Sequence, residues 1–390
     1  MTTSAVAAPM TRARILLFAF CCGAIVGNLY YAQPIIDLIA PDVGLSSRGA
    51  SLVVSLSQIG YALGLFFLVP LADLLENRKL MIATVVLAVA SLFAAASASQ
   101  PGPFLALSLL IGFSSVAVQI LIPLAAHMAP EATRGRVVGS VMSGLVLGIL
   151  LARPLSSLVA DHFGWRAMYL AAAAAMLAII ALLALTVPPY KPAHRATYGQ
   201  LLASLWHLFR HHAPLRERAV YQAAMFGCFS LFWTAAPLEL ARVYGLSQTQ
   251  IALFALVGAA GAISAPLAGR WADAGLTRPA TTAALALAGV SFLIDALPGA
   301  GVIGLALTGV VLDFAVQMNM VLGQRVIYSL DPASRARLNG LYVTSLFLGG
   351  AVGSALASPL YASLGWNGVM IAAIAVSVAG SLMHQWHLRR

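Results

Sequence analysis

Two ionisable side chains stand inside long runs of apolar residues. Asp313 lies 11 residues after Val302, near the middle of one run. Arg153 lies 17 residues after Arg136, inside another. A charged residue at the centre of a membrane-spanning helix costs about 2.5–3.5 kcal/mol even on the mildest scale, so its presence indicates a function by default. A carboxyl group in such a place is suited to carrying a proton, and a guanidinium group to binding an anion.

The chemistry that we expect of Asp313 is reversible protonation. Burial favours the neutral form of a carboxyl group and a nearby cation favours the charged form, so a carboxyl group that alternates between two settings can couple proton movement to transport. Gln317 follows at i+4 and Gln324 at i+11, which puts the three side chains on one helix face. The alternative is a structural aspartate held by a fixed partner.

Arg153 has three interpretations. It lies eight residues before Asp161, about 12 Å from that end of its run at 1.5 Å per residue. It binds an anionic group of a substrate, or it pairs with a carboxylate such as Asp313. The third interpretation is structural, between helices or with the guanidinium extended toward the membrane surface.

Other polar and aromatic side chains in the apolar runs complete a predicted substrate site. Gln119 and Gln317 occupy equivalent places in two related halves of the chain, which predicts a central cavity lined by two amides. Phe226 and Trp233 share one helix face, and such a stripe stacks an aromatic ligand or packs against neighbouring helices and lipid. The predicted substrate contacts are Asn28, Tyr31, Gln58, Gln119, Arg153, Phe226, Trp233, Gln317 and Asn319.

Membrane-spanning helices must position these residues. Apolar residues make up 61% of the 390 residues and charged residues 9%, whereas a soluble protein has about 25% charged residues. A helix needs about 20 apolar residues to cross the hydrocarbon layer. The apolar runs do not alternate in polarity, as the strands of a membrane barrel would. We predict twelve spans, at residues 15–36, 50–71, 80–98, 104–126, 137–160, 167–187, 219–240, 250–271, 280–297, 302–324, 338–360 and 367–387.

The distribution of Lys and Arg residues predicts the orientation. When the N-terminus is placed inside, nearly all of the 22 Lys and Arg residues fall on the inner side. Only Arg48, Arg166 and Arg242 fall outside, with Arg153 inside a helix. The positive-inside rule therefore predicts that both termini are cytoplasmic. The first apolar run is too long for a cleaved signal peptide, so we expect it to remain as the first helix.

The two halves of the chain are related in sequence. An offset of 201 residues aligns Arg134 with Arg335 and Gly148 with Gly349. Parallel six-helix repeats are typical of one large transporter class. We therefore predict an all-α membrane protein of two pseudo-symmetric six-helix bundles, residues 1–187 and 219–390. The linker, residues 188–218, is predicted to contain an amphipathic helix near 198–209, because its leucines recur at helical spacing.

The loop after the second run carries a motif of a known family. Leu71, Ala72, Asp73 and Arg78 resemble the loop motif of the major facilitator superfamily, and the second half repeats it with Gly269, Ala272, Asp273 and Arg278. The resemblance covers essentially the whole chain and implies that family's twelve-helix fold. It also implies a gating role, in which the motif ties neighbouring helix ends together on the cytoplasmic side. The alternative is that these charged residues only set the membrane topology and form a surface ion pair, which contributes little to stability. The implied gating residues are Asp73, Arg78, Asp273 and Arg278.

Residues 28–34, Asn-Leu-Tyr-Tyr-Ala-Gln-Pro, and the size of the chain resemble small bacterial efflux-type members of that superfamily, which are related to drug:proton antiporters. Gly144, Gly148 and Pro154 fit the fifth-helix motif of those antiporters, although Arg153 stands where they have glycine. The fourth helix has Gln119, where many of them carry arginine. The resemblance implies a multi-pass protein of the bacterial inner membrane.

We therefore predict a secondary transporter, not an enzyme, that moves a small organic molecule by alternating access, with proton-coupled efflux as the first hypothesis. The alternatives are organic-anion uptake or a facilitated carrier that uses Arg153, and a non-transporting receptor or scaffold. The sequence has no Gly-Lys-Ser/Thr phosphate loop, no H-E-x-x-H and no C-x-x-C, so no cofactor, metal site or catalytic residue is predicted. Expected partners are the substrate, protons and the lipid bilayer, without nucleic acid, and we expect a monomer.

Overall fold

The structure is a computed structural model that describes residues 10–192, 197–258, 264–331 and 334–389, and all regular elements in these residues are helical. Within them, nine helical stretches are long and apolar enough to cross a membrane. The first half of the chain contains α1 (Arg12–Gly27), η1 (Gln33–Ile35), α2 (Ile36–Asp42), α3 (Leu52–Phe67), η2 (Val69–Asp73), α4 (Asn77–Ser97), α5 (Pro101–Ser114), α6 (Ala117–Met128), η3 (Glu131–Thr133), α7 (Arg134–Phe163) and α8 (Trp165–Thr186).

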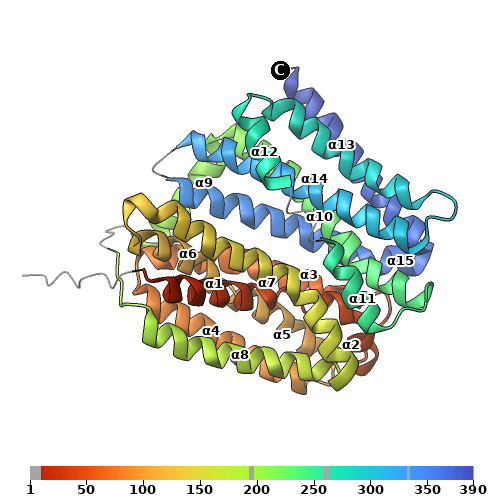
Figure 1. Cartoon of the computed structure of the whole chain (residues 1–390), viewed down its shortest axis with the longest axis horizontal. Coiled ribbons are helices and arrows are strands. Elements are labelled where there is room, and N and C mark those ends of the chain that lie inside the picture. The colour runs from red at the N-terminus through yellow and green to blue at the C-terminus, as the bar shows by residue number, and fades with distance from the viewer. Residues whose placement is uncertain (1–9, 193–196, 259–263, 332–333, 390) are drawn as a thin grey trace, which may run out of the picture.

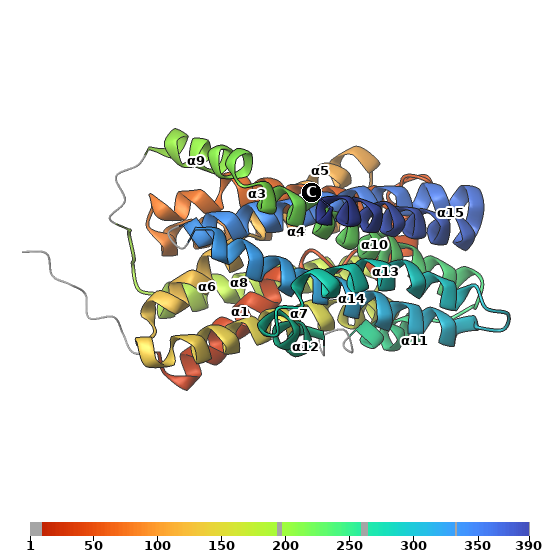
Figure 2. The ribbon, with the colours of Figure 1, turned by 90° about the horizontal axis from the view of Figure 1, so that it is seen from above.

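The second half of the chain packs beside the first. Figure 1 shows α1 to α8 as one group of helices, in red to yellow-green, and α10 to α15 as another, in green to blue. We call the end of the molecule that carries α9 and the start of α1 the linker end, and the opposite end, with α2 and the start of α11, the far end (Figures 1 and 2). The elements of the second half are α9 (Tyr198–His211), α10 (Ala213–Arg242), α11 (Gln248–Ala255), α12 (Ser264–Asp273), α13 (Thr277–Asp295), α14 (Gly301–Leu330) and α15 (Arg335–Leu388).

Several of the twelve predicted spans depart from single straight helices, and the fourth is divided between α5 and α6. The first divides into α1 and α2 around residues 28–35. The eighth divides into α11 and α12, and residues 259–263 between them lie outside the described residues. The last two spans lie within α15 as two helices that are joined at Gly365, whose φ of 63° and ψ of −155° are not helical. Glycine adopts a positive φ without steric cost, so it marks the turn between the two predicted spans.

The break after α1 has a local cause. Tyr30 N donates to Gly27 O at 2.9 Å, so the chain tightens into three-residue turns. Pro34 has no N–H and cannot continue an α-helical ladder. Residues 28–35 therefore leave the regular helix inside the predicted first span, and their side chains and carbonyl groups become available for other contacts.

The linker element α9 contacts both halves. A capping box at Thr197 fixes its start. Tyr198 donates its hydroxyl to Phe67 O at 2.9 Å, at the end of α3. Arg337 Nη1 of α15 donates to Ser204 Oγ at 3.0 Å. The α9 helix therefore joins the linker-end tips of α3 and α15.

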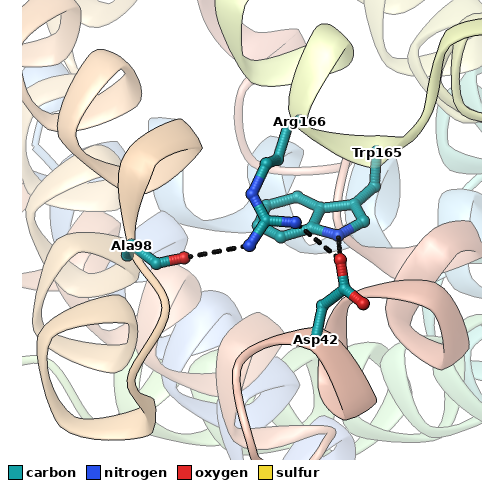
Figure 3. Close-up of polar contacts among 4 residues, drawn as sticks. All are labelled: Asp42, Ala98, Trp165 and Arg166. Carbon is teal, nitrogen blue, oxygen red and sulfur yellow. Dashed lines mark hydrogen bonds and ion pairs between the residues drawn. The ribbon is translucent and has the colours of Figure 1, made fainter.

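At the far end of the first half, Asp42 ties three helices together (Figure 3). Its carboxylate accepts hydrogen bonds from Trp165 Nε1 at 2.9 Å and Arg166 Nη1 at 2.5 Å, and Arg166 Nη2 donates to Ala98 O at 3.3 Å. The Trp165 indole and the Arg166 guanidinium hold the pKa of Asp42 below its usual range, because both donate to the charged carboxylate.

Glycines hold the same helix pair together in each half. A Cβ atom on Gly148 of α7 would lie 2.3 Å from Gly23 Cα of α1, and one on Gly353 of α15 would lie 2.0 Å from Gly227 O of α10. Only a residue without a side chain permits this approach of two backbones. The related sequences of the halves thus produce one packing arrangement twice.

We predict that Gly148→Ala and Gly353→Ala each lower the thermal unfolding midpoint of the detergent-solubilised protein. The added methyl group forces the helices apart, which costs about 1–3 kcal/mol. The matched controls are Gly139→Ala and Gly340→Ala, on the same two helices, where a Cβ atom meets nothing within 4 Å. Equal losses of stability in all four variants would contradict the packing role.

Candidate functional site

Arg153 is buried where the two halves meet. Its side chain is 4% exposed, and its Nε donates to Gln33 Oε1 at 2.8 Å. The guanidinium carbon lies 4.6 Å from the ring centroid of Trp233, 5.0 Å from that of Tyr30 and 5.3 Å from that of Phe229. We call these three rings the aromatic cage. Desolvated cations gain about 2 kcal/mol or more over an aromatic face, so the cage offsets part of the cost of burying the charge.

The cage is built from both halves of the chain. Arg153 comes from α7, and Tyr30 and Gln33 come from the interruption after α1. Trp233 and Phe229 come from α10 in the second half. The break at residues 28–35 thus supplies a hydrogen-bond acceptor and a ring to Arg153. The α10 helix supplies the other two rings from the opposite side of the interface between the two halves, which we call the seam.

Asp313 lies beside the cage on α14. Its side chain is 9% exposed, and Trp233 Nε1 donates to its Oδ1 at 2.9 Å. A Cβ atom on Gly258 would lie 2.7 Å from Asp313 Oδ2 and 3.0 Å from the Trp233 ring, so the lack of a side chain there lets the carboxyl group and the indole pack against the backbone. Arg153 and Asp313 are therefore linked through Trp233, which contacts both.

The far end of the seam is closed by contacts between the halves. Arg242 at the end of α10 forms an ion pair with Asp37 of α2. Thr249 Oγ1 of α11 donates to Asp161 Oδ2 of α7 at 2.5 Å. Deeper in the seam, Ser55 Oγ of α3 donates to the Ala351 carbonyl of α15 at 2.7 Å. Ser51 and Ser358 each donate a backbone N–H to the hydroxyl of the other, at 3.1 and 3.3 Å.

The linker end contains a cavity of about 330 Å³ between the halves. Its walls come from α3, η2 and α6 of the first half, from residues 190 and 192, and from α9 and α15. Gln119 lines it and donates Nε2 to the hydroxyl of Tyr61 at 3.0 Å. Tyr61 in turn packs edge-on against Phe347 of α15, with centroids 4.6 Å apart. The molecule is thus closed at the far end and hollow at the linker end.

The predicted amide positions are distributed along the seam and within each half. Gln58 Nε2 donates to Ser230 Oγ across the seam at 3.0 Å. Asn28 Nδ2 donates to Ser115 Oγ at 3.4 Å within the first half, and Asn319 Nδ2 donates to Gln222 Oε1 at 2.7 Å within the second. Only Gln58 among these three predicted contacts joins the halves.

Gln317 is half-buried on the face of α14 that also carries Gln324. Gln324 Nε2 donates to Asn339 Oδ1 at 3.3 Å, and Asn339 lines the linker-end cavity. The face that carries Asp313 and Gln317 therefore continues toward the cavity.

The remaining predicted contacts are buried against neighbouring groups. Phe226 stacks on Phe229, with centroids 4.9 Å apart, and meets Phe347 of α15 at 5.3 Å. Tyr31 is buried, and its carbonyl accepts a hydrogen bond from Ser156 Oγ at 2.6 Å. Trp233 is 1% exposed inside the cage, so its faces are occupied in this conformation.

The predicted gating residues are not gathered into one contact. Arg78 pairs with Glu76 at 3.6 Å, whereas Asp73 lines the linker-end cavity. The Arg278 carbonyl lies 3.3 Å from His384 Nε2. The side chain of Asp273 lies outside the described residues.

Sequence reasoning did not select Gln33, Asp37 or Arg242. Gln33 was identifiable, since it directly precedes Pro34 in the span, where a broken helix exposes groups for binding. Asp37 and Arg242 come from different halves, and no spacing in the sequence indicates that they meet.

Three comparisons with known proteins agree with this architecture. A family model of the Major Facilitator Superfamily matches residues 15–294 and 218–390. The chain is 38% identical over 375 residues to the uncharacterized transporter YgaY of Escherichia coli O157:H7, covering 96% of this chain and 95% of that protein. It is 34% identical over 369 residues to the probable transporter SCO4007 of Streptomyces coelicolor, covering 93% and 85%. Among solved structures, the nucleoside transporter NupG superimposes with a TM-score of 0.76 at 16% identity, covering 95% of this chain and 98% of that one.

We predict that Arg242→Gln loosens the far end without unfolding the protein. The side chains of Arg242 and Asp37 are 44% and 33% exposed, so the pair contributes at most about 1 kcal/mol, which is about fivefold in the open population. Maleimide labelling of Ser55→Cys measures this, because the native cysteines are buried. The matched control is Arg48→Gln, at an exposed far-end arginine. An equal gain in labelling with the control would contradict a specific role for the ion pair.

Proposed function

The chain belongs to the Major Facilitator Superfamily, and on that basis we propose that it exports a small organic molecule across the bacterial inner membrane in exchange for protons. Family membership establishes a multi-pass secondary transporter rather than an enzyme, and the fold is the twelve-helix fold of that family. Family membership does not give the substrate, the coupling ion or the direction of transport, and our proposal concerns these three properties.

The observation that carries the proposal is the buried carboxyl group of Asp313 in the seam. It sits on α14 of the second half, beside a cation that belongs to α7 of the first half. Movement of the halves relative to each other therefore changes the distance between Asp313 and Arg153. Since a carboxyl group gives up its proton more readily near a cation, closing the far end favours proton release and opening it favours proton uptake.

We assign the linker end to the cytoplasm, because the segments at that end carry nearly all of the Lys and Arg residues. With this orientation, the linker-end cavity opens toward the cytoplasm and the closed far end faces outward. Substrate enters the cavity at Gln119 and moves along the α14 face toward Gln317. The halves then rock, and the far end opens while the linker end closes.

In this cycle, Asp313 takes up a proton while the far end is open, and releases it toward the linker end when the far end closes. Substrate moves in the opposite direction. The aromatic side chain of Phe226 and the amide of Gln58 lie where the halves meet, and we propose that they contact the substrate as the seam opens. Asp73, Arg78 and the equivalent loop residues of the second half act at the linker end, where closure would bring the halves together.

A second function has one specific observation in its favour. Arg153 Nη2 is buried and, within the described residues, has no hydrogen-bond partner. A buried donor without a partner costs about 1–3 kcal/mol, and a carboxylate or phosphate of a substrate would satisfy it. Transport of an organic anion on Arg153 is therefore the alternative to proton-coupled export.

We predict that Asp313→Asn abolishes substrate-driven proton movement in liposomes. The amide resembles the neutral acid in shape but neither releases nor takes up a proton at physiological pH. The purified protein is reconstituted with a pH dye inside the vesicles, and a panel of aromatic cations, organic anions and neutral solutes is added. The matched control is Asp295→Asn, at the far end of α13, which should behave as wild type.

Two outcomes would contradict this assignment. Proton movement by Asp313→Asn equal to that of wild type would remove Asp313 from the role of carrier. Flux of a labelled anion that is independent of protons and lost in Arg153→Leu would favour the alternative function.

A further inference from the structure

We infer that Trp233 is a positioning residue that couples the charge of Asp313 to the opening of the far end, through its contact with Arg153 on the other half. The inference rests on the proposed proton coupling and goes beyond it, because it identifies how a proton on Asp313 changes the strength of the contact between the two halves.

The indole makes two different contacts with two different halves of the transporter. Its edge donates Nε1–H to Asp313 Oδ1 at 2.9 Å. Its face lies 4.6 Å from the guanidinium carbon of Arg153, the shortest of the three cage distances. A phenylalanine provides only the face and an amide only the donor, whereas the indole of tryptophan combines the two contacts.

The indole is held in place from its remaining sides. Trp233 is 1% exposed, and it packs edge-on against Phe232 and Phe254, with centroids 5.3 and 6.1 Å away. At Gly258, a Cβ atom would lie only 3.0 Å from the ring. The indole therefore cannot turn away when Asp313 changes its charge, and the change is transmitted to the contact with Arg153.

The direction of the coupling follows from electrostatics. A carboxylate at the N–H edge pushes electron density toward the ring, and a more negative ring face attracts a cation more strongly. A neutral carboxylic acid lacks this effect. Charged Asp313 thus strengthens the cation–π contact between Trp233 of α10 and Arg153 and favours the closed far end. Protonated Asp313 weakens this contact and favours opening.

Few charged or titratable groups act at this point. In the described part of the chain, the charged or titratable groups that act on Asp313 are Arg153 from α7 and Tyr30 from the turn after α1. Trp233 from α10 and Gly258 after α11 bring no charge. A pH response of the seam that Asp313→Asn abolishes is therefore attributable to Asp313, with Trp233 as its link to Arg153.

The experiment measures opening of the far end without a substrate. Spin labels are attached at Ser47→Cys, in the loop before α3, and at Leu297→Cys, after α13; both positions are exposed at the far end, and the native cysteines are buried. Distances between the labels are recorded by electron-electron resonance in nanodiscs over roughly pH 5 to 9, which spans the range expected for a perturbed carboxyl group. The variants are wild type, Asp313→Asn, Trp233→Phe, Trp233→Leu and Phe229→Leu.

We expect the long-distance population of wild type to grow as the pH falls, and that of Asp313→Asn not to depend on pH. Trp233→Phe keeps the ring face but loses the donor to the carboxylate, so its midpoint should move up by about one pH unit. Phe229→Leu removes a cage ring that does not hydrogen-bond to Asp313. It should raise the open population at every pH, with a smaller shift of the midpoint than Trp233→Phe, and Trp233→Leu should show both effects.

Different results would contradict the proton coupling through Asp313 and the positioning role of Trp233. If Asp313→Asn keeps the pH response of wild type, the proposed proton coupling fails. If Asp313→Asn loses the response but Trp233→Phe retains the wild-type midpoint, the coupling stands and the role of Trp233 is overturned.

A second readout covers the case in which the Trp233 variants do not fold. In protein with ¹⁵N-labelled tryptophan, the Trp233 indole signal should move upfield in Asp313→Asn, because the charged acceptor is gone. An unchanged set of indole signals in Asp313→Asn would overturn the inference.

Discussion

A guanidinium group buried between two halves of a membrane protein sets the main constraint on this structure. Arg153 is 4% exposed, so its charge must be compensated by nearby groups, and these groups come from both halves. Gln33 and Tyr30 in the first half and Phe229 and Trp233 in the second surround it. The position of α7 relative to α10 thus depends on one cation, and any motion that separates them exposes that cation to a different environment.

Other features of the fold follow from that arrangement. At residues 28–35 the chain leaves the regular helix, and this break brings the Gln33 side chain to the Arg153 guanidinium. The backbone contacts at Gly148 and Gly353 keep each half rigid, since the helices there touch without intervening side chains. Rigid halves that meet at a polar and aromatic seam are suited to rocking, because little has to be repacked within each half.

Much of this was predictable from the sequence because lipid imposes simple rules. The twelve spans and the relation between the halves are predicted from apolar length and residue spacing, and the family match confirms the fold. Asp313 and Arg153 stood out because charge is rare in such runs. Their connection through Trp233 was not predictable, since it depends on the packing of α7, α10 and α14 across the seam. Trp233 itself was selected as a ligand contact on the basis of its helix face, which says nothing about what covers that face. Asp37 and Arg242, which close the far end, lie in ordinary loop-end positions and carry no signal in the sequence.

The most direct test of the link between proton and conformation is to fix the conformation and measure the proton. Ser51 and Ser358 exchange hydrogen bonds across the closed seam, so a cysteine pair at these positions would hold the far end shut. Infrared difference spectra, with Asp313→Asn to identify the band, would report protonation of the Asp313 carboxyl group against pH with the pair oxidised and reduced. We predict that the protonated-carboxyl band grows in at lower pH in the oxidised, locked protein, because Arg153 is then held beside Asp313. The same titration in both forms would contradict a coupling between Asp313 and the opening of the seam.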